Sequence, residues 1–173
     1  MLTIQTVYDA QEVLREALYQ TDVIHTNRLT DRCDLCLKAE NLQKTGSFKI
    51  RGAYYKIARL SPEEKKRGVI ACSAGNHAQG VALAAQKNGI PALICLPDRA
   101  PISQAEATKS YAAELCLVPG VYDDAYQRAL ALQKERQMTF IHPFGDEEVI
   151  AGQGTIGLER LQQVRDLDAV VVP

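Results

Sequence analysis

Short apolar runs alternate with segments of helical periodicity through most of the chain. Four apolar runs, rich in β-branched and aliphatic residues, lie at 68–73, 91–97, 113–119 and 138–142. Between them lie the segments 77–89, 101–112 and 122–136, in which apolar residues recur at helical spacing. Nearly continuous apolar strands that alternate with helices are typical of a parallel sheet buried on both faces. The pattern therefore predicts an α/β fold, with an open parallel sheet and helices on both faces.

The remaining segments also carry patterns of regular structure. We expect further helices at 7–19, 47–60 and 152–166, and short strands at 33–40 and 169–173. Thr6 and Asp9 resemble a capping box at the start of the first of these helices. The last strand ends the sequence at Pro173, where an open α/β sheet would next place a ligand-binding loop. We therefore expect this sequence to be a fragment of a longer protein.

The composition is close to that of an average globular protein. Of 173 residues, 46% are hydrophobic and 24% are charged, and the formal net charge is −1. This balance offers no broad basic surface for nucleic acid or for an anionic membrane. The sequence has no apolar run of about 18 residues, which a membrane-spanning helix requires, and its N-terminus resembles neither a secretory signal nor a transit peptide. We expect a soluble, cytoplasmic protein without nucleic-acid or membrane partners.

Five cysteines, an odd number without framework spacing, indicate reduced and mostly buried thiols. Cys33 and Cys36 form a C-x-x-C pair, which also occurs in zinc and redox sites. A zinc site would need a second close pair of ligands, but His25, His77 and His142 are scattered singly. Positions three apart on a strand also point to opposite faces. We therefore expect two strand cysteines and no metal.

A second motif, Gly152-Gln-Gly-Thr-Ile-Gly157, matches the G-x-G-x-x-G pattern of dinucleotide-binding loops. That function requires a clear strand before the motif and an acidic residue about 20 positions after it. Only the short run 149–151 precedes the motif, and the sequence ends within sixteen residues of it. Tight helix packing through small residues is therefore favoured over dinucleotide binding.

The segment Cys72-Ser-Ala-Gly-Asn-His77 lies between a predicted buried strand and a predicted helix. The backbone amides at that helix start, together with the Ser73 hydroxyl and the Asn76 amide, would form a site for a carboxylate or a phosphate. An ordinary helix cap with a turn glycine is an equally good interpretation of the same residues. The pattern leaves both open.

Lys49 lies in the first turn of a predicted helix that Ser47 can cap. A positive charge is disfavoured at the positive end of a helix dipole, so the lysine pKa falls and the amine becomes available as a nucleophile or a base. Most lysines are solvated surface residues, however, and the composition does not distinguish Lys49 from them.

Three segments, in this order, carry a resemblance to a known family: EN-x-x-x-TGSFKIRGA, ACSAGNHAQGVA and IAGQGTIGLE. They resemble the pyridoxal-phosphate-dependent threonine dehydratases (threonine ammonia-lyases) of the tryptophan-synthase-β fold type, also called fold type II. The short, catabolic form is the most similar, and the resemblance covers the chain from about residue 20 onward. It implies pyridoxal 5'-phosphate as the cofactor. It also implies elimination of water from L-threonine or L-serine, giving ammonia and 2-oxobutanoate or pyruvate.

The resemblance also assigns roles to individual residues. Lys49 would hold the cofactor as a Schiff base and later exchange the substrate α-proton. Phe48 would lie against the pyridine ring, and Asn76 would bind the phenolic oxygen of that ring. The substrate carboxylate would be bound by the loop made of Ser73, Ala74, Gly75, Asn76 and His77.

The same resemblance predicts how the chain is divided. Residues 1–45 would belong to a large cofactor domain, 46–144 would form a small α/β domain, and 145–173 would return into the large domain. The glycine-rich loop that binds the cofactor phosphate, and a serine that contacts the pyridine nitrogen, would both follow Pro173. We therefore expect the isolated 173-residue chain to be inactive, and the full-length protein to be a homo-oligomer.

The sequence is also compatible with two alternatives to a threonine dehydratase. Cysteine and threonine synthases fit less well, because they usually have Asp at the position of Ile50 and Thr at that of His77. Serine racemases differ at Ala74, where they have a second serine, so a racemase-like enzyme is one alternative. The other is an inactive truncated module that binds a partner through an exposed sheet edge.

Overall fold

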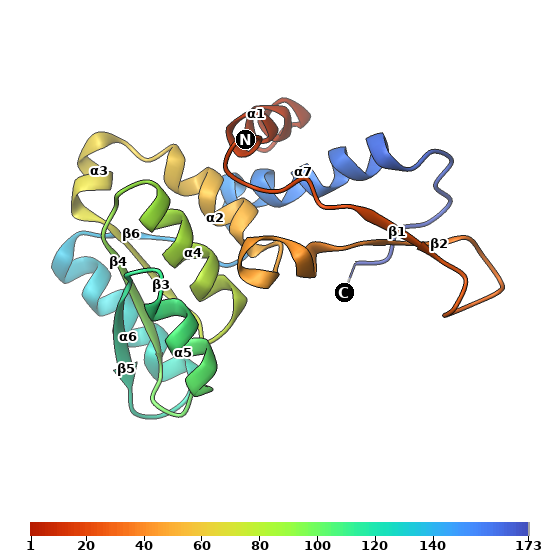
Figure 1. Cartoon of the computed structure of the whole chain (residues 1–173). Helices are drawn as coiled ribbons and strands as arrows, with labels where there is room; N and C mark the ends of the chain where they lie inside the picture. The colour runs from red at the N-terminus through yellow and green to blue at the C-terminus, as the bar shows by residue number, and fades with distance from the viewer. Residues whose placement is uncertain (173) are drawn as a thin grey trace.

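A four-stranded parallel sheet forms the centre of the structure, a computed structural model that describes residues 1–172. Its strands are β3 (Val69–Cys72), β4 (Ala92–Pro97), β5 (Glu114–Val118) and β6 (Thr139–Phe140). They lie in the order β5-β4-β3-β6, and every neighbouring pair is parallel (Figure 1). All four strands lie within the apolar runs of the sequence, so the predicted parallel sheet is confirmed.

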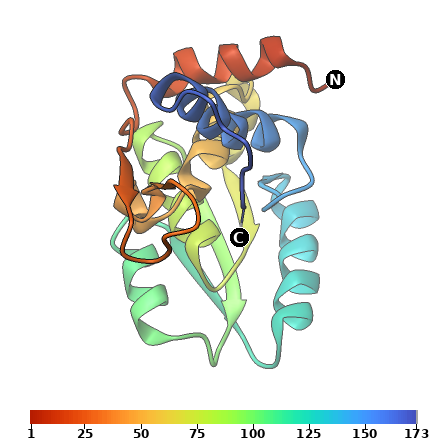
Figure 2. The ribbon, with the colours of Figure 1, turned by 90° about the vertical axis from the view of Figure 1, so that its right-hand side faces the viewer.

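The connections between the strands place helices on both faces of the sheet. The chain steps from β3 to β4 through α4 (Asn76–Lys87) and from β4 to β5 through α5 (Ile102–Lys109). It then returns through α6 (Tyr122–Arg136) to β6, on the other side of β3. Right-handed crossovers put the returning helix on the opposite face, and Figure 2 shows α6 on one side of the sheet and α4 and α5 on the other. The direction of travel reverses between β3 and β6, and ligands bind at such a switch point, at the carboxyl ends of the strands.

The two faces of the sheet bury separate sets of side chains. Alternate residues of β3 and β4, such as Val69 and Ile94, pack with α4 and with α2 (Lys49–Ala58). The intervening residues, such as Ile70 and Cys95, pack with α6. Burial on both faces removes the polar positions that a half-exposed strand would show, which explains the continuous apolar runs of the sequence.

The other elements lie mainly beside the sheet. They are α1 (Ile4–Leu14), β1 (Val23–Thr26), β2 (Leu35–Lys38), the short 3-10 helices η1 (Glu40–Leu42) and η2 (Lys44–Gly46), α2 (Lys49–Ala58), α3 (Pro62–Arg67) and α7 (Glu147–Gln163). Strands β1 and β2 form an antiparallel ribbon that extends away from the sheet, whereas α1 and α7 pack with α2 (Figure 1). The longest helix, α7, has 17 residues, and no helix within residues 1–172 is long and apolar enough to cross a membrane.

The first helix starts and ends earlier than predicted. Its capping box is made by Thr3 and Thr6, not by Thr6 and Asp9: the Thr6 amide donates to Oγ1 of Thr3 at 3.3 Å, and the Thr3 amide donates to Oγ1 of Thr6 at 3.1 Å. Asp9 instead accepts a hydrogen bond from Gln5 within the helix. Two threonines three apart make the same reciprocal pair of hydrogen bonds one turn earlier, so the local pattern permitted both starts.

The C-terminal segment also differs from the prediction. Helix α7 begins at Glu147, not at residue 152, because Oδ1 of Asp146 accepts hydrogen bonds from the amides of Glu148 and Val149. Residues 169–172 form no strand, and Val171 is 91% exposed. A strand requires a neighbour for its backbone groups, and within residues 1–172 none pairs with this segment. The prediction of a buried strand was therefore wrong for these residues, while Pro173 lies outside the described part.

Candidate active site

The amine of Lys49 lies at the carboxyl end of β6. Lys49 is the first residue of α2, and its Nζ donates a hydrogen bond of 2.9 Å to the carbonyl oxygen of Pro143, three residues after β6 ends. The start of α2 is therefore next to the switch point between β3 and β6. This is the position at which α/β sheets bind ligands.

The chain before Lys49 shapes the entry into α2. Oγ of Ser47 accepts a hydrogen bond of 3.2 Å from the Lys49 amide, as the predicted cap requires, although the N-cap position itself is occupied by Phe48. The aromatic ring of Phe48 is partly exposed, and its centroid lies 5.2 Å from Nζ of Lys49. An accessible aromatic face thus lies beside the amine.

Burial lowers the pKa of Lys49. Removal of the ammonium group from water disfavours the charged form, and the position at the start of α2 acts in the same direction. A lowered pKa increases the neutral fraction of the amine near pH 7, and only the neutral amine attacks a carbonyl carbon.

The loop that follows β3 leads directly into α4. The Gly75 amide donates a hydrogen bond of 3.2 Å to Oγ of Ser73, and no side chain caps α4, whose N-cap residue is Gly75. Helix α4 thus starts at a glycine without a side-chain cap, which fits both the glycine-turn cap and the anion-binding loop that the sequence allows. Ala74 is half-buried and Asn76 is exposed. The first amides of α4 lack a side-chain acceptor, as an anion-binding loop requires.

Helix α4 lies directly against the start of α2. Gly80 lies one turn into α4, and a Cβ atom on it would lie 3.1 Å from backbone atoms of Lys49 and of Ile50. A Cβ atom at this distance from backbone would crowd it, so glycine allows the two helices to approach closely. The loop 73–77 and Lys49, which are far apart in sequence, are thus brought to the same end of the sheet.

His77 points into the protein. Its side chain is 4% exposed, and Nε2 lies 2.9 Å from the carbonyl oxygen of Ile141 at the end of β6. A carbonyl oxygen only accepts, so Nε2 carries the proton, and Nδ1 is buried without a partner in the described structure. Burial lowers the pKa of His77 to about 4. Any contribution of this residue to the loop must therefore come from its backbone.

The buried His77 is expected to make stability dependent on pH. The imidazole has a pKa of about 4 in the folded chain and 6.5 in an ordinary environment, so the unfolded chain binds more protons between these values. The stabilisation is present above pH 6.5 and is lost as the pH falls toward 4, by at most about 3 kcal/mol. Denaturant unfolding between pH 7.5 and 4.5 measures this loss. His77→Asn, which can still donate to Ile141, should make the free energy of unfolding depend less on pH. An unchanged pH dependence would show that His77 is not its cause.

The glycine motif 152–157 lies inside α7 and follows no strand. A Cβ atom on Gly152 would lie 2.6 Å from Cα of Gly52 and 2.7 Å from the carbonyl oxygen of Arg51. Gly152 therefore allows α7 and α2 to cross with their backbones in contact. The prediction of tight helix packing is confirmed, and a dinucleotide-binding turn is absent from this segment.

The C-x-x-C pair lies on the β1–β2 ribbon. Cys36 is in β2 as predicted, and its Sγ lies 3.2 Å from Nδ1 of His25 on the facing strand. Cys33 lies in the exposed loop before β2, so its assignment to the strand was wrong. Within residues 1–172, no group of three or more His, Cys, Asp or Glu side chains is placed to hold a metal ion.

Two features of the site were not predicted from the sequence. Pro143 and Ile141, whose carbonyls bind Lys49 and His77, follow β6. Nothing in the sequence reveals that β6 pairs with β3, because strand order depends on the crossovers. Arg51, by contrast, lies within the recognised motif and could have been singled out by its position two residues after Lys49.

The residues around Lys49 fit pyridoxal phosphate. The aldehyde of the cofactor requires an amine with an increased neutral fraction, which burial provides at Lys49. Its flat ring requires an apolar face, and the ring of Phe48 lies beside that amine. Its polar groups require donors, and the start of α4, with the exposed Asn76, lies against the same turn of α2.

Comparison with known proteins agrees with this fit. The chain is 51% identical to an L-threonine ammonia-lyase of Thermotoga maritima over 175 aligned positions, which cover 100% of this chain and 44% of that protein. The structure of maize serine racemase is similar with a TM-score of 0.93 and 36% sequence identity, covering 96% of this chain and 51% of the racemase. Threonine deaminase isoform 2 of Solanum lycopersicum has a TM-score of 0.89 and 36% identity, with 95% of this chain and 49% of the deaminase covered.

The chain is shorter than its relatives. It spans about half the length of the curated relatives it matches. Its solved neighbours share its α/β fold, which is that of fold type II. Residues 14–173, nearly the whole sequence, match the family described as pyridoxal-phosphate dependent enzyme. The chain therefore belongs to the family of pyridoxal-phosphate-dependent enzymes.

Proposed function

We propose that this chain is the lysine-bearing part of an enzyme that eliminates water from L-threonine or L-serine and releases ammonia. One observation carries the proposal: the Lys49 amine, with its lowered pKa, lies beside Phe48 at the switch point of a parallel sheet. The identity of 51% with an L-threonine ammonia-lyase supports this reaction over others of the family. The cofactor, when bound, supplies the electron sink that stabilises negative charge at the substrate α-carbon.

The residues of this chain would then hold the reactants and move one proton. Lys49 holds the cofactor through Nζ, and its amine later takes the α-proton as a general base. Phe48 packs against the cofactor ring and keeps water from one side of it. Asn76 donates to the phenolic oxygen of the ring. The loop 73–77 binds the substrate carboxylate through the amides that no side chain caps at the start of α4.

We further propose the division into 1–45 and 145–173 as parts of a large domain, with 46–144 as the small domain. In such a protein the phosphate-binding loop lies outside this chain, and the isolated chain is inactive. The full-length protein is a cytoplasmic homo-oligomer without nucleic-acid or membrane partners. Its five free thiols support a reducing compartment.

Covalent trapping tests the role of Lys49. The chain is mixed with pyridoxal phosphate, reduced with borohydride and mapped by peptide mass spectrometry. We expect the pyridoxyl group on Lys49 at near neutral pH, because its pKa is lowered and that of Lys56 is raised by ion pairs with Glu148 and Asp146 that outweigh burial. Lys66, an exposed lysine, is the internal control. Preferential labelling of Lys44, whose pKa is also lowered by burial and by Lys87, or of Lys56 or Lys66 would contradict the proposal.

A racemase is the second candidate, favoured by the similarity to maize serine racemase. Racemisation needs a second acid–base group on the far side of the α-carbon, and Ala74 has no ionisable atom for this task. In a protein of the relatives' length, L-serine is therefore expected to give pyruvate with little D-serine. Chiral chromatography of the unreacted serine measures the ratio. D-serine formed as fast as pyruvate would favour the racemase instead. Ala74→Ser should raise the rate of D-serine formation modestly.

A further inference from the structure

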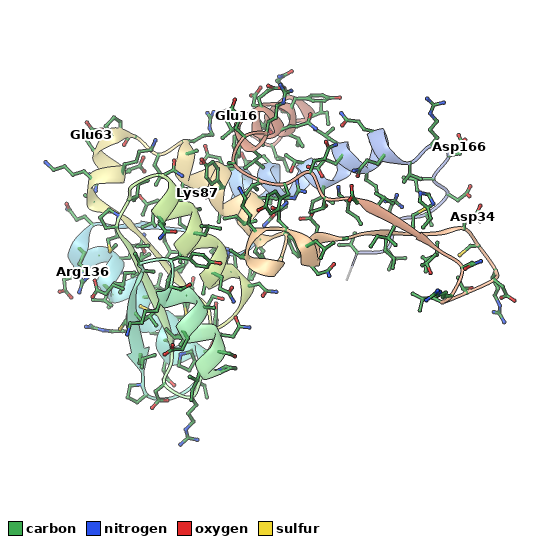
Figure 3. All side chains as sticks on the ribbon, viewed as in Figure 1. Glu16, Asp34, Glu63, Lys87, Arg136 and Asp166 are labelled. Carbon is green, nitrogen blue, oxygen red and sulfur yellow. The ribbon has the colours of Figure 1, made fainter. Side chains whose placement is uncertain are left out.

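Arg51 is the most deeply buried charged residue near the site. It lies two residues after Lys49 and is 1% exposed, whereas charged side chains such as Glu63, Arg136 and Asp166 lie at the periphery (Figure 3). A buried guanidinium is costly unless each donor has a partner. The contacts of Arg51 therefore indicate what the protein gains from this residue.

All five N–H donors of Arg51 are used. Nε and Nη2 donate to the two oxygens of Glu40 at 2.8 and 2.7 Å. Nη1 and Nη2 donate to the two oxygens of Glu159 at 2.6 and 3.0 Å, and Nη1 also donates to Oγ1 of Thr155 at 3.2 Å. The first turn of α2 is thus joined to η1 on one side and to α7 on the other by paired, planar contacts. Only a guanidinium has this geometry.

The partners of Arg51 are themselves held in place. Glu40 accepts a hydrogen bond of 2.6 Å from Thr21, and Glu159 accepts one of 2.6 Å from Nζ of Lys38 in β2. The cluster of Arg51, Lys38, Glu40 and Glu159 contains two charges of each sign, so it is neutral as a whole. A neutral, fully bonded cluster is rigid and fixes the elements from which its members come.

The same stretch of α7 also contacts the backbone of α2. Gly152 permits the contact with Gly52 described above, and Gln153 follows it. Oε1 of Gln153 accepts a hydrogen bond of 3.2 Å from the Gly52 amide. The amide donates, so the bonded atom of Gln153 is its oxygen. The motif 152–155 therefore contacts α2 through the backbone of Gly152, the amide of Gln153 and the hydroxyl of Thr155.

The direction of Lys49 depends on this first turn. Residues two apart on a helix are separated by about 200° around its axis, so Lys49 and Arg51 point to nearly opposite sides. Arg51 points to α7, while Lys49 points to Pro143 at the end of β6. Any rotation or shift of the turn would move the amine away from its half-buried position beside Pro143.

We propose that Arg51 and Gln153 are positioning residues for Lys49: they hold the first turn of α2 against α7 so that the amine is directed to the carboxyl end of β6. This inference rests on the proposed function of Lys49 as the cofactor-binding lysine. It assigns a role to the glycine motif of α7, which supports the site from behind α2 without contacting the reactants.

Two variants separate positioning from mere stability. Arg51→Lys keeps the charge but loses the planar, paired contacts. Gln153→Leu leaves the ion cluster intact and removes the hydrogen bond to Gly52 together with Nε2 of Gln153, which is buried without a partner within residues 1–172. Arg59→Lys, at the exposed end of α2, is the matched control, because Arg59 also pairs with a glutamate of α7, Glu148.

The readout is the reactivity of Lys49 itself, measured on the 173-residue chain. Competitive acetylation at a series of pH values, read by mass spectrometry, gives the titration midpoint of Lys49 against that of Lys66. His77, which α4 brings near Lys49, is neutral throughout the alkaline range, since its pKa is lowered to about 4. Pyridoxal phosphate with borohydride gives the yield of labelled Lys49 at pH 7.5.

We expect both variants to raise the titration midpoint of Lys49 and to lower the pyridoxyl yield by about three- to tenfold. Arg59→Lys should change neither. A midpoint that stays unchanged in a folded variant would overturn the inference, as would an equal change in Arg59→Lys or loss of cooperative unfolding in both test variants. If the unchanged chain is not labelled preferentially at Lys49, the proposed function fails instead.

Discussion

Replacement of Lys49 by alanine is expected to abolish both cofactor attachment and turnover. The change removes the atom that binds the cofactor and the base that takes the α-proton, so the loss falls on kcat and not on KM. We expect a decrease of at least about 10³-fold in ammonia release from L-threonine, since a single acid–base group contributes about 10²–10⁴-fold and the covalent link is lost as well. The assay uses a protein of the relatives' length that begins with this chain.

The control for this variant is Lys66→Ala, which removes an exposed lysine of α3. It should leave kcat unchanged. The unfolding transition of Lys49→Ala should remain close to that of the unchanged protein, because within residues 1–172 the Lys49 side chain makes a single hydrogen bond, to Pro143. Turnover within tenfold of the unchanged protein would show that another lysine holds the cofactor.

Gly152→Ala is expected to cause a large loss of stability for the addition of a single methyl group. The added Cβ would lie 2.6 Å from Cα of Gly52, a backbone atom that no side-chain rotation can move away. Helices α2 and α7 must then separate, which would also strain the contacts of Arg51 with Glu159. We expect the free energy of unfolding to fall by about 2–3 kcal/mol, as overpacking of a close contact does. Denaturant unfolding of the 173-residue chain at pH 7.5 measures the change.

The same helix provides a matched control at Gly157. This residue is exposed, and a Cβ atom on it would meet no other atom within 4 Å. Gly157→Ala should be neutral or stabilising by up to about 1 kcal/mol, because alanine favours the helix over glycine. If Gly152→Ala and Gly157→Ala changed stability alike, the two helices would not be in backbone contact.

The sequence predicted the regular elements where their signal is local. Each strand of the sheet lies in an apolar run that both faces bury, and α4, α5 and α6 follow the helical periodicity of their segments. Where two local solutions compete, the prediction was less accurate. Thr3 and Thr6 cap α1 in place of Thr6 and Asp9, and the valines 170–172 are exposed although their apolar run is typical of a core strand. An apolar run becomes a strand only where another strand offers its backbone groups.

For the candidate site, the sequence motifs singled out Lys49 and the loop 73–77 as candidates. Their roles remain predictions, but their placement at the start of α2 and between β3 and α4 follows from helix and strand signals in the sequence. The contacts of these residues, by contrast, could not be predicted from the sequence. The imidazole of His77 points inward to Ile141, and the amine of Lys49 meets Pro143, across 94 residues of chain.

What the sequence alone determined is therefore the α/β class, the strands of the parallel sheet and the helices between them. It also singled out candidate residues for the chemistry, whose roles remain predictions. Local periodicity, turn residues and short motifs encode these, because each depends on neighbours within a few positions. Only the tertiary structure decided that β6 returns beside β3, that α7 crosses α2 in backbone contact, and that Arg51 is enclosed by Glu40 and Glu159. These contacts join segments up to 108 residues apart. They depend on the shape and charge of both partners in the folded chain, and a short stretch of sequence contains only one of the two partners.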